Sequence, residues 1–103
     1  MSDICLIESP ITHIVLAGST VVIPMHGMRV IPQLHASDNV DFYVFSEEEY
    51  RRLPSGHPFQ QWHGSDLTGA LTLPGNRPWY LIVANRNSQP IQLSGFLCQS
   101  RTK

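Results

Sequence analysis

The sequence predicts an all-β protein: a single antiparallel β-sandwich, jelly-roll-like, with eight or nine short strands and one short helix near residues 46–53. Short runs rich in Val, Ile, Leu, Phe, Tyr and Trp recur about every ten residues and are separated by turn residues. No run has the length and period of a long helix. At 103 residues the chain has room for one hydrophobic core, so residues 1–103 are expected to form one domain.

Five strands are expected in the first half of the chain. They are Ile4–Ile7, Ile11–Ala17, Thr20–Pro24, Met28–His35 and Val40–Phe45. Gly18 and Ser19 form a turn that makes a hairpin of the second and third strands. Pro32 cannot donate a backbone hydrogen bond, so the fourth strand is expected at a sheet edge or as an irregular extended segment.

Four more strands are expected in the second half. They are Phe59–His63, Leu67–Leu73, Trp79–Ala84 and Ile91–Gln99. Alternation in the second of these places Leu67, Leu71 and Leu73 inward, with Thr68 and Thr72 facing out.

The last two predicted strands differ in character. Trp79–Ala84 has no polar alternation, so it is expected to be a central strand covered on both faces. A short connection, Asn85–Pro90, then leads to Ile91–Gln99, in which Gly95 indicates a β-bulge.

A short helix is expected over Ser46–Leu53. Ser46 and Glu49 have the spacing of a capping box, in which each side chain bonds the backbone N–H of the other residue. Phe45 and Tyr50 flank them at the positions of a hydrophobic staple.

The charges of this segment fit the same helix. Glu47 with Arg51 and Glu48 with Arg52 are four residues apart in the favoured order. The acids lie at the positive end of the helix dipole and the arginines at its negative end. We therefore interpret the acidic run as part of the scaffold rather than as a cation site.

The charge balance excludes some partners. The net charge is −1, and the seven basic residues are scattered along the chain. Nucleic acids and anionic membranes are normally bound by a basic cluster, so neither is expected as a partner. The only lysine is Lys103, which argues against Schiff-base chemistry, because such chemistry needs a desolvated lysine.

The N-terminal residues have no basic region, and their apolar run ends at Glu8, which is too short for a signal peptide. No stretch approaches the roughly 20 apolar residues that span a bilayer. A cytoplasmic location is therefore expected, with Cys5 and Cys98 reduced and buried. Pairing of the terminal strands would instead make the two sulfur atoms neighbours.

The chain has five histidines, and metal binding must be considered. They are His13, His26, His35, His57 and His63. No HxH, HExxH or CxxC spacing occurs, so we expect no metal site and no cofactor, and interpret the histidines as surface or hydrogen-bonded core residues. Their charge should become more positive as the pH falls toward about 6.

The run Trp62–Asp66 is a candidate ligand-binding surface, together with the nearby His57. An aromatic ring beside the hydroxyl of Ser65 and the carboxylate of Asp66 is typical of sugar-binding and peptide-binding surfaces. In the alternative interpretation Trp62 fills the core and residues 64–66 form a turn.

Two further observations bear on site residues. His63, Ser65 and Asp66 supply the residue types of a catalytic triad, but no nucleophile elbow is present, so no catalytic residue is assigned. Asp41 is a single acid at the start of an otherwise apolar strand, and helix formation does not explain it. We therefore include Asp41 among the candidate ligand-binding residues.

Residues 40–94 are similar to a known kind of module. Its landmarks are Asp41–Phe45, the Glu/Arg turn ending at Gly56, the strand Gly69–Leu73, Trp79–Asn85 and Pro90–Gly95. This order resembles the small β-sandwich modules of the GOLD type over about half of the chain, and bacterial pre-peptidase C-terminal domains have a similar spacing. The resemblance implies an antiparallel sandwich with a role in binding or protein interaction, and it brings no catalytic residues.

The sequence thus favours a non-catalytic binding or protein-interaction module that uses the surface around residues 57–66 or a sheet edge. A protein or a small ligand such as a carbohydrate is the expected partner. The alternative is a structural subunit of a homo-oligomer, because the scarcity of lysine leaves strand edges thinly protected against self-association. A small metal-dependent enzyme is the third possibility.

Overall fold

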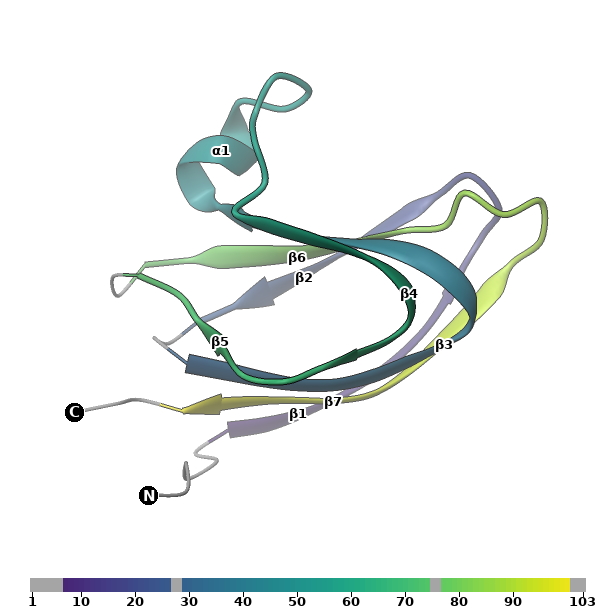
Figure 1. The fold of residues 1–103 in the computed structure, drawn as a ribbon, viewed down its shortest axis with the longest axis horizontal. Helices are drawn as coiled ribbons and strands as arrows, with labels where there is room; N and C mark the ends of the chain where they lie inside the picture. The colour runs from purple at the N-terminus through teal and green to yellow at the C-terminus, as the bar shows by residue number, and fades with distance from the viewer. Residues whose placement is uncertain (1–6, 27–28, 75–76, 101–103) are drawn as a thin grey trace.

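The computed structural model describes residues 7–26, 29–74 and 77–100, and in these residues seven strands form one antiparallel sheet curled into a half-barrel (Figure 1). The strands are β1 (Ile7–Val15), β2 (Thr20–Met25), β3 (Arg29–Ser46), β4 (Gln60–Thr68), β5 (Leu71–Thr72), β6 (Trp79–Ala84) and β7 (Ile91–Ser100); the helix is α1 (Glu47–Arg51). The predicted all-β fold with one short helix is confirmed. A sandwich of eight or nine strands is not, and the predicted strand Ile4–Ile7 lies almost wholly outside the described residues.

The strand β3 organises the sheet. Along one edge it pairs first with β7, through residues 29–36, and then with β6, through residues 41–46. Its other edge pairs with β5 and β4. The sheet therefore forks near residues 37–40 into two parts that curl around a common core (Figure 1). We call them the β7 wing (β1, β7 and residues 29–36) and the β6 wing (β2, β6 and residues 41–46).

Three predicted strand boundaries are wrong, because ladder pairing continues through residues that usually interrupt strands. The strand β1 runs through Pro10, which lies opposite Phe96. The strand β3 joins two predicted strands into one of 18 residues. The strand β4 likewise includes residues 64–66, which the alternative interpretation made a turn.

Pro32 lies in the middle of the sheet rather than at its edge. It is opposite Leu97 of β7, while on the other edge the ladder passes from Val30–Leu71 to Gln33–Thr68. Pro32 thus falls at the break between β5 and β4, where no partner needs its missing N–H.

Gly95 is not at a bulge, contrary to the prediction. The β7 register is continuous there, and the irregularity of β3 lies between His35 and Val40. Gly95 has a φ of 135°, and a Cβ atom on it would lie 1.9 Å from the carbonyl oxygen of Gln33. The close approach of β7 to β3 is what requires glycine here.

The core fills the inside of the half-barrel, and every strand contributes to it. Leu67, Leu71 and Leu73 are buried, while Thr68 and Thr72 are exposed, as predicted. The strand β6 has the predicted bounds and lies between β3 and β2. Five of its six residues are buried and Tyr80 is half-buried, which confirms a central strand covered on both faces.

The helix α1 is shorter than predicted, but Ser46 is its N-cap, as predicted. The hydroxyl of Ser46 accepts a hydrogen bond from the N–H of Glu49 at 3.3 Å. The carboxylate of Glu47 pairs with Arg51 at 2.7 Å. The expected pair of Glu48 with Arg52 is not formed, because Glu48 pairs with the distant Arg77 and Arg52 pairs with its neighbour Glu49.

These redirected contacts anchor α1. Glu48 pairs with Arg77 at 3.0 Å, and Arg52 pairs with Glu49 at 3.5 Å. The ring of Tyr50 stacks on that of Tyr80, with 4.3 Å between centroids. The helix is therefore fixed to the start of β6.

Asn85 connects the turns at the far end of the β6 wing. Its side chain is 1% exposed, and its Nδ2 donates to the carbonyl oxygens of Val15 and Gln89, each at 2.9 Å. Its Oδ1 accepts from the N–H of Asn87 at 2.9 Å. Its own backbone bonds the β1–β2 turn at Gly18 and Ser19. One satisfied buried amide thus ties together both chain reversals of this end.

The terminal strands pair, and this affects the cysteines. Glu8 of β1 lies opposite Cys98 of β7. Cys98 is disulfide-bonded, so the expectation of a reduced thiol is wrong for this residue. Cys5 lies outside the described residues. No helix within the described residues has the length and apolar character to cross a membrane.

Candidate functional site

The outer face of the β6 wing carries a second apolar layer. Alternation along β3 turns Val40, Phe42 and Val44 toward the core and the odd-numbered residues outward. Three apolar residues of the outer face, Phe45, Ile82 and Ala84, are nevertheless buried, although they do not belong to the core cluster. Something other than the core must therefore cover them.

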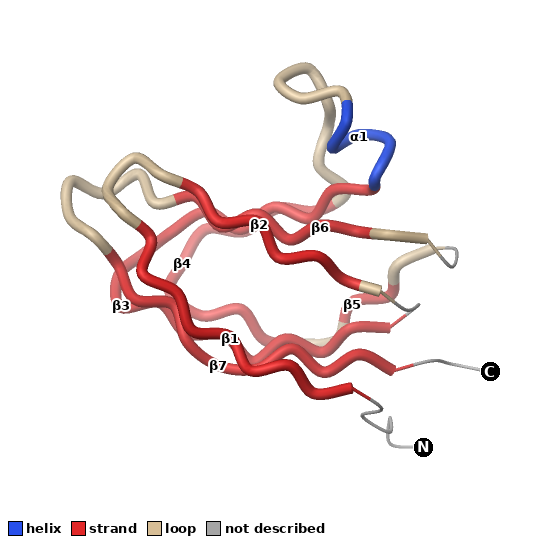
Figure 2. Tube along the Cα trace, turned by 180° about the vertical axis from the view of Figure 1, so that it is seen from behind, coloured by secondary structure: helices blue, strands red, loops and turns tan. Residues whose placement is uncertain are grey.

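The cover is α1 and the segment that follows it, which stand over the β2–β6 side of the sheet (Figure 2). Between cover and sheet lies a groove of about 520 Å³. Its apolar walls include Val22, Phe45, Tyr50, Leu53, Pro58 and Ile82. This volume falls in the usual range of small-ligand sites, roughly 300–1,000 Å³.

The covering segment, residues 52–59, forms an arch that is held by contacts of its backbone. We call it the arch. Gly56 passes so close to α1 that a Cβ atom would lie 1.9 Å from the carbonyl oxygen of Glu49. The carboxylate of Glu49 accepts from the N–H of His57 at 3.5 Å, and the N–H of Phe59 donates to Val44 at 2.7 Å. The arch is thus tied both to the helix and to β3.

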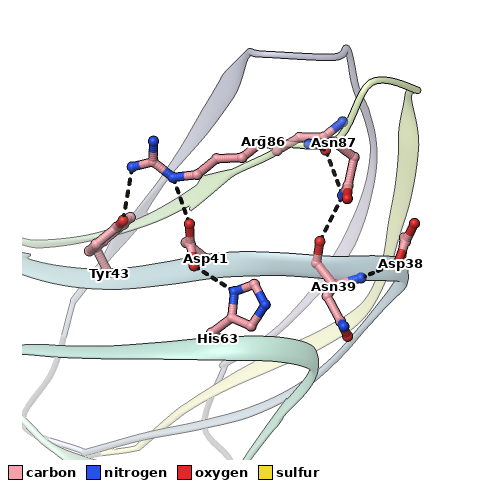
Figure 3. Close-up of polar contacts among 8 residues, drawn as sticks. Asp38, Asn39, Asp41, Tyr43, His63, Arg86 and Asn87 are labelled. Carbon is pink, nitrogen blue, oxygen red and sulfur yellow. Dashed lines mark hydrogen bonds and ion pairs between the residues drawn. The ribbon is translucent and has the colours of Figure 1, made fainter.

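A polar cluster adjoins the groove, whose lining includes Tyr43 and Arg86. Figure 3 shows the contacts of this cluster. The Nε of Arg86 donates to Oδ2 of Asp41 at 2.7 Å, and its Nη2 donates to the Tyr43 hydroxyl at 3.2 Å. Oδ1 of Asp41 contacts Nδ1 of His63 at 2.7 Å. Three separate parts of the chain, β3, β4 and the residues after β6, therefore meet at one carboxylate.

These contacts set the charges of the cluster. The hydrogen bond with His63 lowers the pKa of Asp41, burial opposes this, and the bond from Arg86 lowers the pKa further. Hydrogen bonds with Tyr43 and Asp41 raise the pKa of Arg86. At neutral pH the cluster thus holds an ionised carboxylate and a charged guanidinium.

The structure separates the sequence-predicted site residues into groups. Asp41 and His63 are opposite each other in the β3–β4 ladder and form the pair described above. Trp62 is partly buried and packs against the core, which agrees with the alternative interpretation of this residue. His57 is exposed on the arch.

The remaining predicted residues lie at a second contact of β3 with β4. Asp66 pairs with His35 through Oδ1 at 2.7 Å. The Ser65 hydroxyl donates to the same carboxylate at 3.4 Å, rather than to a histidine. Ser65, His63 and Asp66 are therefore not arranged as a triad. Within the described ranges, no group of three or more His, Cys, Asp or Glu side chains could hold a metal ion.

Sequence reasoning missed Arg86, Tyr43 and the groove. Alternation did place Tyr43 on the same face as Asp41, and that was the available signal. The position of Arg86 depends on how Asn85 folds the connection after β6, and the groove depends on how the arch crosses the sheet.

Comparison with known proteins does not assign the chain. No protein-family model matches it, and no curated protein matches its sequence significantly.

Proposed function

We propose that this protein is a non-catalytic binding module whose ligand occupies the groove between the β6 wing and α1. The observation that carries this proposal is a groove of about 520 Å³ with apolar walls and hydrogen-bonding groups at one end. Small-molecule sites commonly combine apolar walls with a few placed polar groups that orient the ligand.

The proposal keeps the binding role expected from the sequence but moves its location from residues 57–66 to the groove. The resemblance to GOLD-type modules supports a binding role, and the two wings around one core are compatible with such a sandwich. Of the expected ligand classes, the apolar walls favour a small apolar molecule over a carbohydrate. A metal-dependent enzyme has no supporting cluster among the described residues.

A fragment screen by ¹⁵N-resolved NMR tests the proposal. Fragments should shift amide signals of residues that line the groove, such as Val22 and Ile82. The variant Val22→Trp should abolish these shifts, because the 38% exposed Val22 lines the groove and the larger ring would fill it. Ile14→Trp is the matched control, since Ile14 is a 72% exposed strand residue that does not line the groove. Unchanged binding to Val22→Trp would contradict the proposal.

A structural subunit of a homo-oligomer remains the second candidate function. The observation that favours it is the exposure of Ile14 and Leu16, at 72% and 61%, on the edge strand β1 and the adjoining turn. Sedimentation of the protein and of Ile14→Glu tests this candidate. An assembly that the glutamate variant disrupts would support it, and a monomer at high concentration would contradict it.

A further inference from the structure

We infer that the ligand of the groove is a small carboxylate with an apolar body, and that Arg86 and the Tyr43 hydroxyl bind its carboxylate group. This inference rests on the proposed function, because it specifies the chemistry of the molecule in the same groove.

Charge complementarity is the first argument. Among the described residues that line the groove, Arg86 is the only charged one. The nearby carboxylate of Asp41 already has a partner on each oxygen, since Oδ1 contacts His63 and Oδ2 accepts from Arg86. A cationic ligand could pair only with the Asp41 carboxylate, whose two oxygens already have partners. An anionic ligand could accept hydrogen bonds from the Arg86 guanidinium, which still has N–H groups to donate.

The geometry of the guanidinium is the second argument. Its Nε and Nη2 lie along one edge, and this edge is occupied by Asp41 and Tyr43. Within the described residues, the end edge formed by Nη1 and the second Nη2 hydrogen has no such contact. That edge matches the two oxygens of a carboxylate in bidentate fashion. The side chain of Arg86 is 73% exposed, so a ligand can reach it.

Orientation is the third argument. The bonds to Asp41 and Tyr43 hold the long arginine side chain across the end of the groove instead of leaving it free in solvent (Figure 3). A preorganised fork loses less conformational entropy when it binds. The apolar body of the ligand would then lie along Val22, Phe45 and Ile82.

The size of the groove favours a small molecule as its occupant. About 520 Å³ accommodates a single compact ligand, and the arch around Pro54 and Pro58 borders the space on one side. We therefore commit to a free carboxylate of small size rather than to the C-terminus of a protein.

Three probes of equal length test this inference with the full chain at pH 7. Octanoate, octanamide and octylammonium are titrated separately, and binding is followed by the amide shifts of Val22, Ile82 and Ala84. Octanoate should bind about tenfold or more tightly than octanamide, because only octanoate makes a charge-assisted bidentate contact. Octylammonium should bind more weakly than either.

Variants assign the effect to the guanidinium. Arg86→Gln should abolish the preference for octanoate over octanamide, because the variant lacks the charged fork. Arg86→Lys should restore only part of the octanoate preference, because it keeps the charge and loses the fork. Arg51→Gln is the control, since Arg51 is also exposed and ion-paired, through a local contact with Glu47, but does not line the groove. Dispersed amide spectra of each variant establish that it is folded.

The outcomes separate the inference from the proposed function. Equal binding of octanoate and octanamide in the groove, or an octanoate preference that survives Arg86→Gln, overturns the carboxylate assignment and leaves the binding module in place. Tighter binding of a C-terminal leucine peptide than of octanoate overturns the assignment to a small molecule. Absence of groove shifts with all three probes overturns both.

Discussion

Two His–Asp pairs bridge β3 and β4, and they differ in what surrounds them. In each pair the residues are directly opposite in the ladder, and the Nδ1–Oδ1 distance is 2.7 Å. The side chain of Asp41 is 19% exposed and has Arg86 as a second partner, whereas that of Asp66 is 62% exposed and has only the weaker contact with Ser65. The Asp41 pair is therefore part of a larger polar cluster, because a third segment of the chain reaches it.

That third segment depends on Asn85, so removing its amide should have the largest effect. Asn85→Ala should lower the free energy of unfolding by about 2–4 kcal/mol, because it removes the buried hydrogen bond to the Val15 carbonyl oxygen and the part-buried bond to the Gln89 carbonyl oxygen. Urea denaturation measures the change. Asn85→Ala should also make the Asp41 pair resemble the Asp66 pair by releasing Arg86. A loss below about 0.5 kcal/mol would show that the connection does not depend on this amide.

Matched removal of the two carboxylates compares the pairs directly. Asp41→Asn should lower the free energy of unfolding by about 1–2 kcal/mol, because two partners lose an ionised acceptor. Asp66→Asn should change it by no more than about 0.5 kcal/mol, because exposed ion pairs contribute little. Equal losses in the two variants would contradict the distinction.

The effect of Asp41 should depend on pH in a definite direction. Its pKa is lower in the folded protein than in the unfolded chain, where it is about 3.9. Its stabilising contribution is therefore complete above that value and disappears as the pH falls through the lower, folded pKa. The stability difference between the original protein and Asp41→Asn should shrink as the pH falls below about 4.

The smallest expected effect concerns the two histidines. His63→Gln should raise the pKa of Asp41 toward its ordinary value, because the bond with His63 is the largest cause of the lowering. His35→Gln should leave the pKa of Asp41 unchanged, since His35 pairs with Asp66 instead. NMR titration of the Asp41 carboxyl carbon measures this pKa in each variant. An equal change of the Asp41 pKa in His63→Gln and His35→Gln would show that the contact with His63 is not its cause.

Local chemistry made some of the structure predictable. The run Trp79–Ala84 gave the bounds of β6, and the Ser46 cap gave the start of α1, because each depends on neighbouring residues alone. Asp41 was identified as an unexplained acid in an apolar strand, and the structure places it in the polar cluster.

Other features depend on contacts between distant segments and could not be predicted in this way. The continuity of β3 through Pro32 requires a gap in the opposite ladder, which the sequence near Pro32 does not specify. The predicted site did not include Arg86, because the location of Arg86 depends on the neighbouring Asn85, which bonds both the β1–β2 turn and its own connection. The groove arises from the path of the arch, for which local residue preferences give only a loop.

The shared strand β3 also affects how the protein unfolds. Both wings are hydrogen-bonded to this one strand. Neither wing can therefore separate completely unless β3 loses the backbone hydrogen bonds that it makes with that wing. We therefore expect the amides of β3 to exchange with solvent mainly through global unfolding. A molecule held against the β6 wing would then slow exchange in the β7 wing as well, although it touches nothing there.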